Sequence, residues 1–227
     1  MPVFELTDKI VFPHPDLAED TGLLAIGGDL RPERLVKAYQ NGIFPWFSEG
    51  DPLLWWFTSP RLVLFTDELH VTKRLARTIR RHPFEITFDQ DFHQVISECA
   101  TNRTEKGEQT WILSNMQSAY LRLHELGYCH SVECWQGSKL AGGLYGIRLD
   151  NVFFGESMFT RITDASKIAF VALIEHLRKK GVKLIDCQMT TQHLLSFGAK
   201  EISGKQFQQL LAKHIKSTQP DGKWNNE

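Results

Sequence analysis

The chain has 227 residues, of which 42% are hydrophobic and 23% are charged, as in an ordinary globular protein with a sizeable core. Its formal net charge of -1 excludes a wholly basic nucleic-acid binder, although a neutral sum leaves room for a local basic face. No stretch approaches the ~20 apolar residues that span a bilayer, and the N-terminus lacks the pattern of a signal peptide. The composition therefore predicts a globular protein with no membrane partner.

Residues 1–62 are rich in proline, glycine and aromatic side chains, which predicts a small, turn-rich N-terminal lobe. One helix is expected from about Arg31 to Gln40, because Pro32 suits a first helical turn. No flexible linker follows, so we expect the lobe to pack directly on a second domain at residues 63–215. Residues 216–227 are polar and are expected to form a frayed tail.

The second domain mixes helix and strand signals. In chain order these are a helix at 72–81, a strand at 84–89, a helix at 116–126, and antiparallel strands at 130–135 and 139–159 with a turn at Asp150 and Asn151. Asp164 is expected to cap a helix that runs to Gly181 and is followed by a strand at 182–188. A short helix at 192–199 and an amphipathic helix at 204–215 complete the domain.

This order of elements predicts an α+β fold with a mixed sheet, similar to the core of the GNAT acyltransferases. Acyltransferases of that class that use coenzyme A hold its pyrophosphate on a glycine-rich loop at the start of the central helix. The equivalent stretch here, SMFTRITDASK, contains no glycine. We therefore expect an acyl donor other than coenzyme A and no bound cofactor.

The sequence LIDCQ at 184–188 places polar side chains at the end of an apolar strand. Regular alternation would put Asp186 and Gln188 on one face, with Ile185 and Cys187 on the other. Burying an unpaired amide-like group costs roughly ~2–7 kcal/mol, so either a structural network satisfies these groups or the strand opens into a site.

The cysteines indicate a reducing compartment. Cys99, Cys129, Cys134 and Cys187 show no metal-type spacing, so we expect free thiols, no metal and a cytoplasmic location. Cys187 is interpreted as core packing. His130 and His193 are weaker candidates for a catalytic base, and both are interpreted as structural histidines.

A predicted helix with the sequence VTKRLARTIRR carries only positive charges. Its cations are Lys73, Arg74, Arg77, Arg80 and Arg81, without the interspersed acids of a typical paired surface. A solvated helix face and a site for the backbone phosphates of a nucleic acid are both compatible with this pattern.

Tryptophans in loop-like settings offer surfaces for stacking. Trp46 and Trp111 are expected to be exposed, where an unpaired base stacks at roughly ~1–3 kcal/mol, whereas Trp55 and Trp56 are interpreted as core.

Several motifs in one order together resemble the leucyl/phenylalanyl-tRNA–protein transferase family. They are GLLAIGGDL, NGIFPWF, GEQTWI, LHELGYCHSVECW, GGLYG, FFGESMF, DASK and LIDCQ, which lie within residues 11–210. The resemblance implies an aminoacyltransferase that moves Leu or Phe, and less well Met, from aminoacyl-tRNA to the N-terminal amine of proteins beginning with Arg or Lys. Such tagging feeds N-degron proteolysis in the bacterial cytoplasm.

The resemblance also implies roles for single residues. Asp186 would orient the incoming amine, Gln188 would assist at the reacting centre, Glu156 would lie beside the aminoacyl pocket, and Trp46 and Trp111 would bracket the terminal adenosine of tRNA. The basic helix would then contact the tRNA backbone. A buried polar network that braces the sheet remains the alternative for Asp186 and Gln188.

The same resemblance implies an apolar pocket for the donor side chain. Its lining would be Leu144, Phe153, Phe170, Leu173, Leu177 and Ile185, for which ordinary core packing is the alternative. Several family members carry Met at the position of Leu144 and Phe at those of Leu173 and Leu177, so the pocket is expected to differ in shape.

Two other classes of protein compete with this interpretation. A coenzyme A acetyltransferase would need the missing glycine loop. A non-catalytic RNA-binding module would use the basic helix and the tryptophans but leave Asp186, Gln188 and the apolar pocket without a function.

Overall fold

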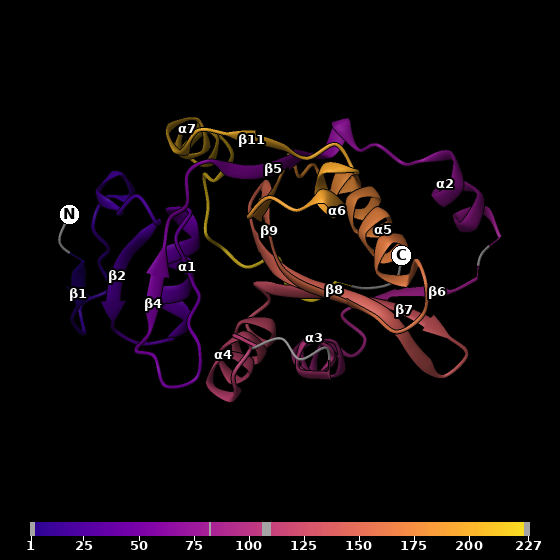
Figure 1. The fold of residues 1–227 in the computed structure, drawn as a ribbon, viewed down its shortest axis with the longest axis horizontal. Helices are drawn as coiled ribbons and strands as arrows, with labels where there is room; N and C mark the ends of the chain where they lie inside the picture. The colour runs from indigo at the N-terminus through magenta and orange to yellow at the C-terminus, as the bar shows by residue number, and fades with distance from the viewer. Residues whose placement is uncertain (1–2, 82, 106–109, 225–227) are drawn as a thin grey trace.

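The computed structural model describes residues 3–81, 83–105 and 110–224. Among these residues the strands form a four-stranded and a seven-stranded sheet, so the expected α+β fold with a mixed sheet is confirmed. Figure 1 shows the small sheet in a lobe at one end of the molecule, beside the larger, curved sheet.

The small N-terminal lobe is built on a sheet of strand order β1-β2-β4-β3. The predicted helix α1 (Pro32–Gln40) packs beside it, with Leu35, Ala38 and Tyr39 on its buried face. The other elements of the lobe are β1 (Phe4–Leu6), a 3₁₀ helix at Pro15–Leu17, β2 (Leu23–Gly27), β3 (Phe44–Pro45) and β4 (Leu54–Trp56). The sequence did not predict these strands, because each is short and interrupted by turn residues.

The larger sheet has the strand order β11-β5-β10-β9-β8-β7-β6. Its strands are β5 (Arg61–Phe65), β6 (Glu85–Phe88), β7 (Cys129–Gln136), β8 (Lys139–Leu149), β9 (Val152–Thr160), β10 (Leu184–Gln188) and β11 (Lys200–Ile202). Strand β10 runs parallel to β9 and antiparallel to β5, which makes the sheet mixed. The hairpin, β-α-β unit and short helix follow in the order on which the likeness to the GNAT core rests.

Helices cover both faces of the larger sheet (Figure 1). On one face lie α5 (Ala165–Lys179) and α6 (Gln192–Leu195), and on the other lie α3 (Phe92–Glu105) and α4 (Ser114–Glu125). The remaining helices are α2 (Lys73–Arg80), a 3₁₀ helix at Thr66–Glu68, and α7 (Gly204–His214). The sequence analysis did not predict α3.

Local signals account for most of the element boundaries. The hydroxyl of Thr72 accepts from the backbone of α2, and Ser203 with Gln206 forms a capping box at the start of α7. Asp164 precedes α5 as expected, but its side chain makes no capping hydrogen bond to the helix. Its φ of 67° turns the side chain away from the helix N–H groups, and it pairs with Lys167 instead.

The C-terminal segment, expected to be a frayed tail, is mostly exposed but is held to the domain by contacts at single residues. Trp224 is 2% exposed, and its ring stacks on that of His130 with centroids 4.0 Å apart. Its backbone N–H donates to Asp89, and the Asp221 N–H donates to the carbonyl of Gly127. A single buried aromatic side chain thus anchors a polar segment. Residues 225–227 lie outside the described part of the chain.

The boundary that the sequence predicts between residues 62 and 63 falls within strand β5. Strand β5 begins at Arg61, so Arg61 and Leu62 already belong to the larger sheet. In the described residues, no helix is both long and apolar enough to cross a membrane.

Candidate active site

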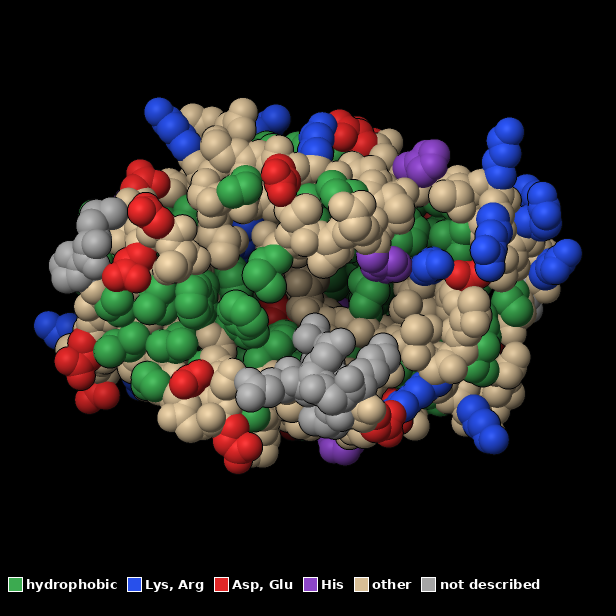
Figure 2. Space-filling view, in the orientation of Figure 1, with side chains coloured by type: hydrophobic (Ala, Val, Ile, Leu, Met, Phe, Trp, Pro, Cys, Tyr) green, Lys and Arg blue, Asp and Glu red, His purple; other side chains and the backbone are tan. Residues whose placement is uncertain are grey.

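A cavity of about 320 Å³ opens between the small lobe and the end of strand β10. Figure 2 shows this face of the molecule hollowed near its centre, with hydrophobic side chains gathered beside the hollow over the small lobe. Strands β8, β9 and β10, helices α5 and α6, and the turn after β3 contribute side chains to its wall. The cavity has a polar side and an apolar side.

Asp186 on β10 lies in the polar part and forms a buried ion pair with Arg61 on β5. The guanidinium donates from Nε to Oδ1 at 2.8 Å and from Nη2 to Oδ2 at 2.6 Å, and both side chains are 0% exposed. The rings of Phe44 and Phe207 flank the guanidinium, with centroids 4.8 and 4.7 Å from its central carbon. Two aligned charge-assisted bonds offset the desolvation of both charges.

Gln188 does not continue the regular alternation of the strand. The register between β10 and β5 shifts at this point, and Gln188 has a φ of 60°, in the left-handed region that non-glycine residues rarely adopt. Its backbone N–H donates to Oδ1 of Asp186 at 2.9 Å. The bulge turns the side chain of Gln188 into the cavity. Cys187 packs against the hydrophobic core, as expected, and also lines the cavity wall.

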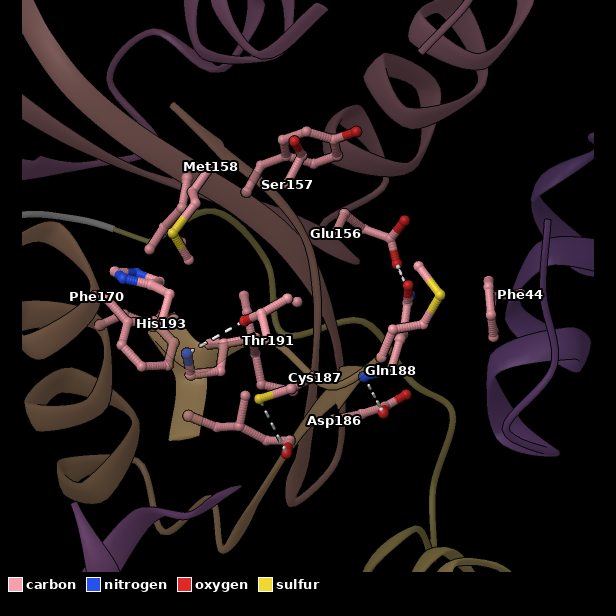
Figure 3. A pocket seen from close by; sticks show the side chains of 18 of the residues that line it. Phe44, Glu156, Ser157, Met158, Phe170, Asp186, Cys187, Gln188, Thr191 and His193 are labelled. Carbon is pink, nitrogen blue, oxygen red and sulfur yellow. Dashed lines mark hydrogen bonds between the residues drawn. The ribbon is translucent and has the colours of Figure 1, made fainter. Parts of the chain in front are cut away.

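Glu156 on β9 faces Gln188 across the polar part of the cavity (Figure 3). Its Oε1 accepts from Gln188 Nε2 at 3.1 Å and from Tyr39 Oη at 2.8 Å, and its Oε2 lies 2.9 Å from Tyr120 Oη. Burial raises the pKa of Glu156 to about 7, although the hydrogen bonds from the two tyrosines oppose this rise. The three polar residues expected in the site therefore line one cavity, and Gln188 is hydrogen-bonded to both of the others.

The apolar part of the cavity contains five of the six expected lining residues. These are Leu144, Phe153, Phe170, Leu173 and Ile185. Within the described part of the chain, Leu177 is not among the lining side chains and lies 0% exposed in the core of the same helix. The seven-residue step from Phe170 along α5 carries Leu177 past the end of the cavity.

Trp46 and Trp111 also line the cavity. Trp46 is 39% exposed, its carbonyl accepts from Trp56 Nε1 at 2.6 Å, and the two rings lie 5.7 Å apart. Trp55 is fully buried, as expected for a core residue, whereas Trp56 is only partly buried. The residues Gly107, Glu108 and Gln109 of the GEQTWI motif lie outside the described part of the chain.

The five cations of the basic helix all have exposed side chains. Lys73, Arg74, Arg77, Arg80 and Arg81 lie on and directly after α2, which Figure 2 shows as a cluster of blue side chains at the edge of the molecule. In residues 3–81, 83–105 and 110–224, no acidic side chain pairs with them. The expected one-signed face is therefore present, at a distance from the polar residues of the cavity.

Two histidines and a cysteine were weighed from the sequence. His130 is 1% exposed, and its Nδ1 lies at hydrogen-bond distance, 2.8 Å, from Oδ2 of Asp89, which fits the structural interpretation. His193 differs from that interpretation because it lines the cavity, and its buried Nε2 has no partner among the described residues. Burial raises the pKa of the Cys187 thiol, which disfavours the reactive thiolate.

Known proteins match this chain along most of its length. A family model described as "Leucyl/phenylalanyl-tRNA protein transferase" matches residues 63–212, and the model of the N-terminal domain of that family matches residues 28–59. A leucyl/phenylalanyl-tRNA–protein transferase of Desulfotalea psychrophila is 54% identical over 224 residues, which cover 99% of both chains. The chain belongs to the leucyl/phenylalanyl-tRNA–protein transferase family. It is therefore an aminoacyltransferase.

A second relative and one solved structure are also similar to this chain. The leucyl/phenylalanyl-tRNA–protein transferase of Stutzerimonas stutzeri is 54% identical over 92% of both chains. Among solved structures, the C-terminal domain of a putative lysylphosphatidylglycerol synthetase from Agrobacterium fabrum overlaps 76% of this chain and 56% of its own, at 13% identity and a TM-score of 0.42.

Three residues of the candidate site were missed by sequence reasoning. Tyr39 lies on the small lobe, Tyr120 on α4 and Arg61 on β5. A signal existed for Arg61, because a buried carboxylate requires a cation and RLVLF begins with the charged residue of an otherwise apolar strand. The tyrosines gave no comparable signal, since their helical spacing is that of ordinary core residues.

Proposed function

We propose that this chain transfers Leu or Phe, and less well Met, from aminoacyl-tRNA to the N-terminal amine of proteins that begin with Arg or Lys. The single observation that carries the proposal is the cavity in which an apolar side for a donor side chain adjoins Glu156 and Gln188, with Trp46 and Trp111 also in the wall. The names of the relatives support Leu and Phe as donors. We further propose a bacterial cytoplasmic location and a role in N-degron proteolysis.

The reaction requires positioning and proton movement. The amine nitrogen attacks the carbonyl carbon of the aminoacyl ester, the N–C bond forms, and the C–O bond to the ribose breaks. The nitrogen loses a proton and the ribose oxygen gains one. The ester is already activated, so the reaction as written consumes no ATP, and alignment in the cavity supplies much of the rate.

Each part of the cavity has a proposed role in this reaction. Leu144, Phe153, Phe170, Leu173 and Ile185 accept the donor side chain, and Trp46 and Trp111 stack on the terminal adenosine. Gln188 and Glu156 lie at the reacting groups as catalytic residues. The basic face of α2 binds phosphates of the tRNA backbone.

The ion pair with Arg61 suggests an indirect role for Asp186. Both carboxylate oxygens accept hydrogen bonds from Arg61, and Oδ1 also accepts the backbone N–H of Gln188. We propose that Asp186 is a positioning residue that holds Gln188 in its left-handed conformation, rather than the group that meets the amine as the resemblance implied.

Transfer of labelled amino acid tests the proposal directly. Leu-tRNA and Phe-tRNA should each label a peptide that begins with Arg, with Met-tRNA a poorer donor. The same peptide with an acetylated N-terminus, and a peptide that begins with Glu, should remain unlabelled. Labelling of the Glu peptide would reject the acceptor specificity, and labelling by acetyl-coenzyme A would assign the chain to a different reaction.

Variants at Asp186 and Gln188 test their roles. Asp186→Asn and Gln188→Glu are nearly isosteric but change the donor and acceptor pattern. Each should lower the single-turnover rate while tRNA affinity is retained. Loss of activity only in proportion to loss of melting temperature would show that the two residues are structural.

A further inference from the structure

Glu156, Tyr39 and Tyr120 form a closed ring of contacts beside the cavity. The Oη atoms of the two tyrosines lie 2.5 Å apart, and each lies within 2.9 Å of one oxygen of the carboxyl group. The ring joins α1 of the small lobe, α4 and β9. Burial raises the pKa of both tyrosines well above the ordinary value, so each brings one proton and no charge.

Counting protons decides the state of this ring. Three oxygen-to-oxygen contacts at hydrogen-bond distance require three protons, and the two phenols supply two. An ionised Glu156 would use both phenol protons, which would leave two hydroxyl oxygens 2.5 Å apart with their lone pairs facing each other. The third proton therefore belongs to the carboxyl group.

The neighbouring amide fixes which oxygen carries this proton. Gln188 Nε2 donates to Oε1 at 3.1 Å, and Tyr39 donates to the same atom, so Oε1 accepts two hydrogen bonds as a carbonyl oxygen does. The proton then lies on Oε2, which donates to Tyr120, and Tyr120 donates to Tyr39. All three bonds run in one direction around the ring.

We infer that the Glu156 carboxyl carries a proton in the resting enzyme, in a hydrogen-bonded ring with Tyr39 and Tyr120, and exchanges this proton with the transfer reaction. The exchange rests on the proposed function, whereas the protonation of the resting site does not. Tyr39 and Tyr120 are positioning residues, because they act through Glu156.

The groups around Glu156 shift its pKa in opposite directions. Burial raises its pKa to about 7, the two tyrosine hydroxyls lower it, Asp186 raises it and Arg61 lowers it. Cys129 and Tyr145 also face this region, and burial raises the pKa of the Cys129 thiol. A pKa close to the working pH suits a group that both gives and accepts a proton.

The ring gives the proton a route to the cavity. One oxygen of Glu156 points to Gln188, and the other points away (Figure 3). A concerted shift of three protons reverses the ring and moves the carboxyl proton from Oε2 to Oε1. The leaving ribose oxygen takes this proton as its C–O bond breaks, and the attacking nitrogen returns one to the carboxylate. The net result is transfer of one proton from nitrogen to oxygen.

Infrared spectroscopy of the enzyme without tRNA tests the protonation. The difference spectrum between the wild-type protein and Glu156→Gln should contain the carbonyl band of a protonated carboxylic acid at about pH 5.5 and lose it by about pH 8.5. Glu133, whose pKa burial also raises, is present in both proteins and cancels. Absence of the band throughout this range would overturn the inference.

Tyrosine variants test the ring. In Tyr39→Phe/Tyr120→Phe, both hydroxyls that are hydrogen-bonded to Glu156 are gone, so the midpoint of the acid band should move by about one unit or more. The alkaline limb of the single-turnover rate should shift with it. Tyr128→Phe is the matched control, because that hydroxyl donates to the carbonyl of Thr218 in the C-terminal segment, and it should leave both midpoints unchanged.

The outcomes separate this inference from the proposed function. An unchanged midpoint in the double variant would show that the tyrosines are only structural. Transfer activity without an acid band would reject the inference and leave the function intact. An acid band that titrates in a protein unable to transfer Leu or Phe would reject the function and leave the protonation intact.

Discussion

Two carboxyl groups share the polar side of one cavity, and their partners differ. Asp186 is fully buried against a guanidinium that donates to both of its oxygens. Glu156 is hydrogen-bonded to uncharged groups, two phenols and an amide. The two carboxyl groups are both at least partly buried, but a cation faces Asp186, whereas Glu156 faces uncharged groups. Burial raises the pKa of Glu156 to about 7, so this group can exchange a proton near neutral pH.

Removal of the Arg61 guanidinium from its pair with Asp186 should have the largest effect on stability. In Arg61→Met the carboxylate of Asp186 stays buried without its partner, which should lower the free energy of unfolding by about 3–5 kcal/mol. Urea denaturation measures this loss. The double variant Arg61→Met/Asp186→Leu should regain most of the stability but not the transfer rate. A loss below about 1 kcal/mol in the single variant would contradict the importance of the pair.

Glu156→Gln should have the second-largest effect on the free energy of unfolding, and this effect should depend on pH. Below about pH 4.5 the carboxyl is protonated in both the folded and the unfolded chain. Between that pH and the folded pKa of about 7, the unfolded chain releases its proton first, so the wild-type protein loses up to about 3 kcal/mol of stability as pH rises.

The amide of Glu156→Gln imitates the protonated acid and does not titrate. The variant should therefore resemble the wild type near pH 4.5 and exceed it in stability at pH 8. Urea denaturation at both pH values gives the comparison, and other titrating groups cancel in the difference. Equal stability of the two proteins at both pH values would argue that Glu156 is ionised in the folded state throughout.

The apolar side of the cavity carries neither carboxyl group. Substitutions there should change which amino acid is transferred. Leu173→Trp narrows the cavity and should lower transfer of Phe relative to Leu by roughly tenfold. Its cost in stability should be about 1–3 kcal/mol, from overpacking. Leu177→Trp makes the same change on the same helix at a residue that does not line the cavity. It should leave the ratio of Phe to Leu transfer unchanged, and a shift in both variants would point to a general effect on the core.

Charges far from both carboxyl groups should have the smallest effect on stability. Arg77→Gln/Arg80→Gln on the exposed face of α2 should change the free energy of unfolding by less than about 0.5 kcal/mol. Each lost phosphate contact should reduce the slope of log affinity for tRNA against log salt by about 0.7–0.9. An unchanged slope would remove α2 from the tRNA interface.

The sequence predicted what local patterns determine. The long helices α1, α4, α5 and α7 follow from periodicity and caps, and the polar residues of LIDCQ and FFGESMF stood out because they interrupt apolar strands. The partner of Asp186 could not be deduced with certainty, because Arg61 lies 125 positions away in the chain. The docking of Trp224 depends on the stacking surface of His130, which only the folded sheet provides.

The position of strand β5 has a consequence for the order of folding. This strand enters the larger sheet early in the chain, yet its neighbours there are β10 and β11 from the other end. Pairing them closes a long loop, whereas the hairpins β7–β8 and β8–β9 form from adjacent segments. We therefore expect the sheet to grow from these hairpins and β5 to join late. Since Arg61 arrives with β5, refolding protein should recover its hairpins before it recovers the ability to transfer an amino acid.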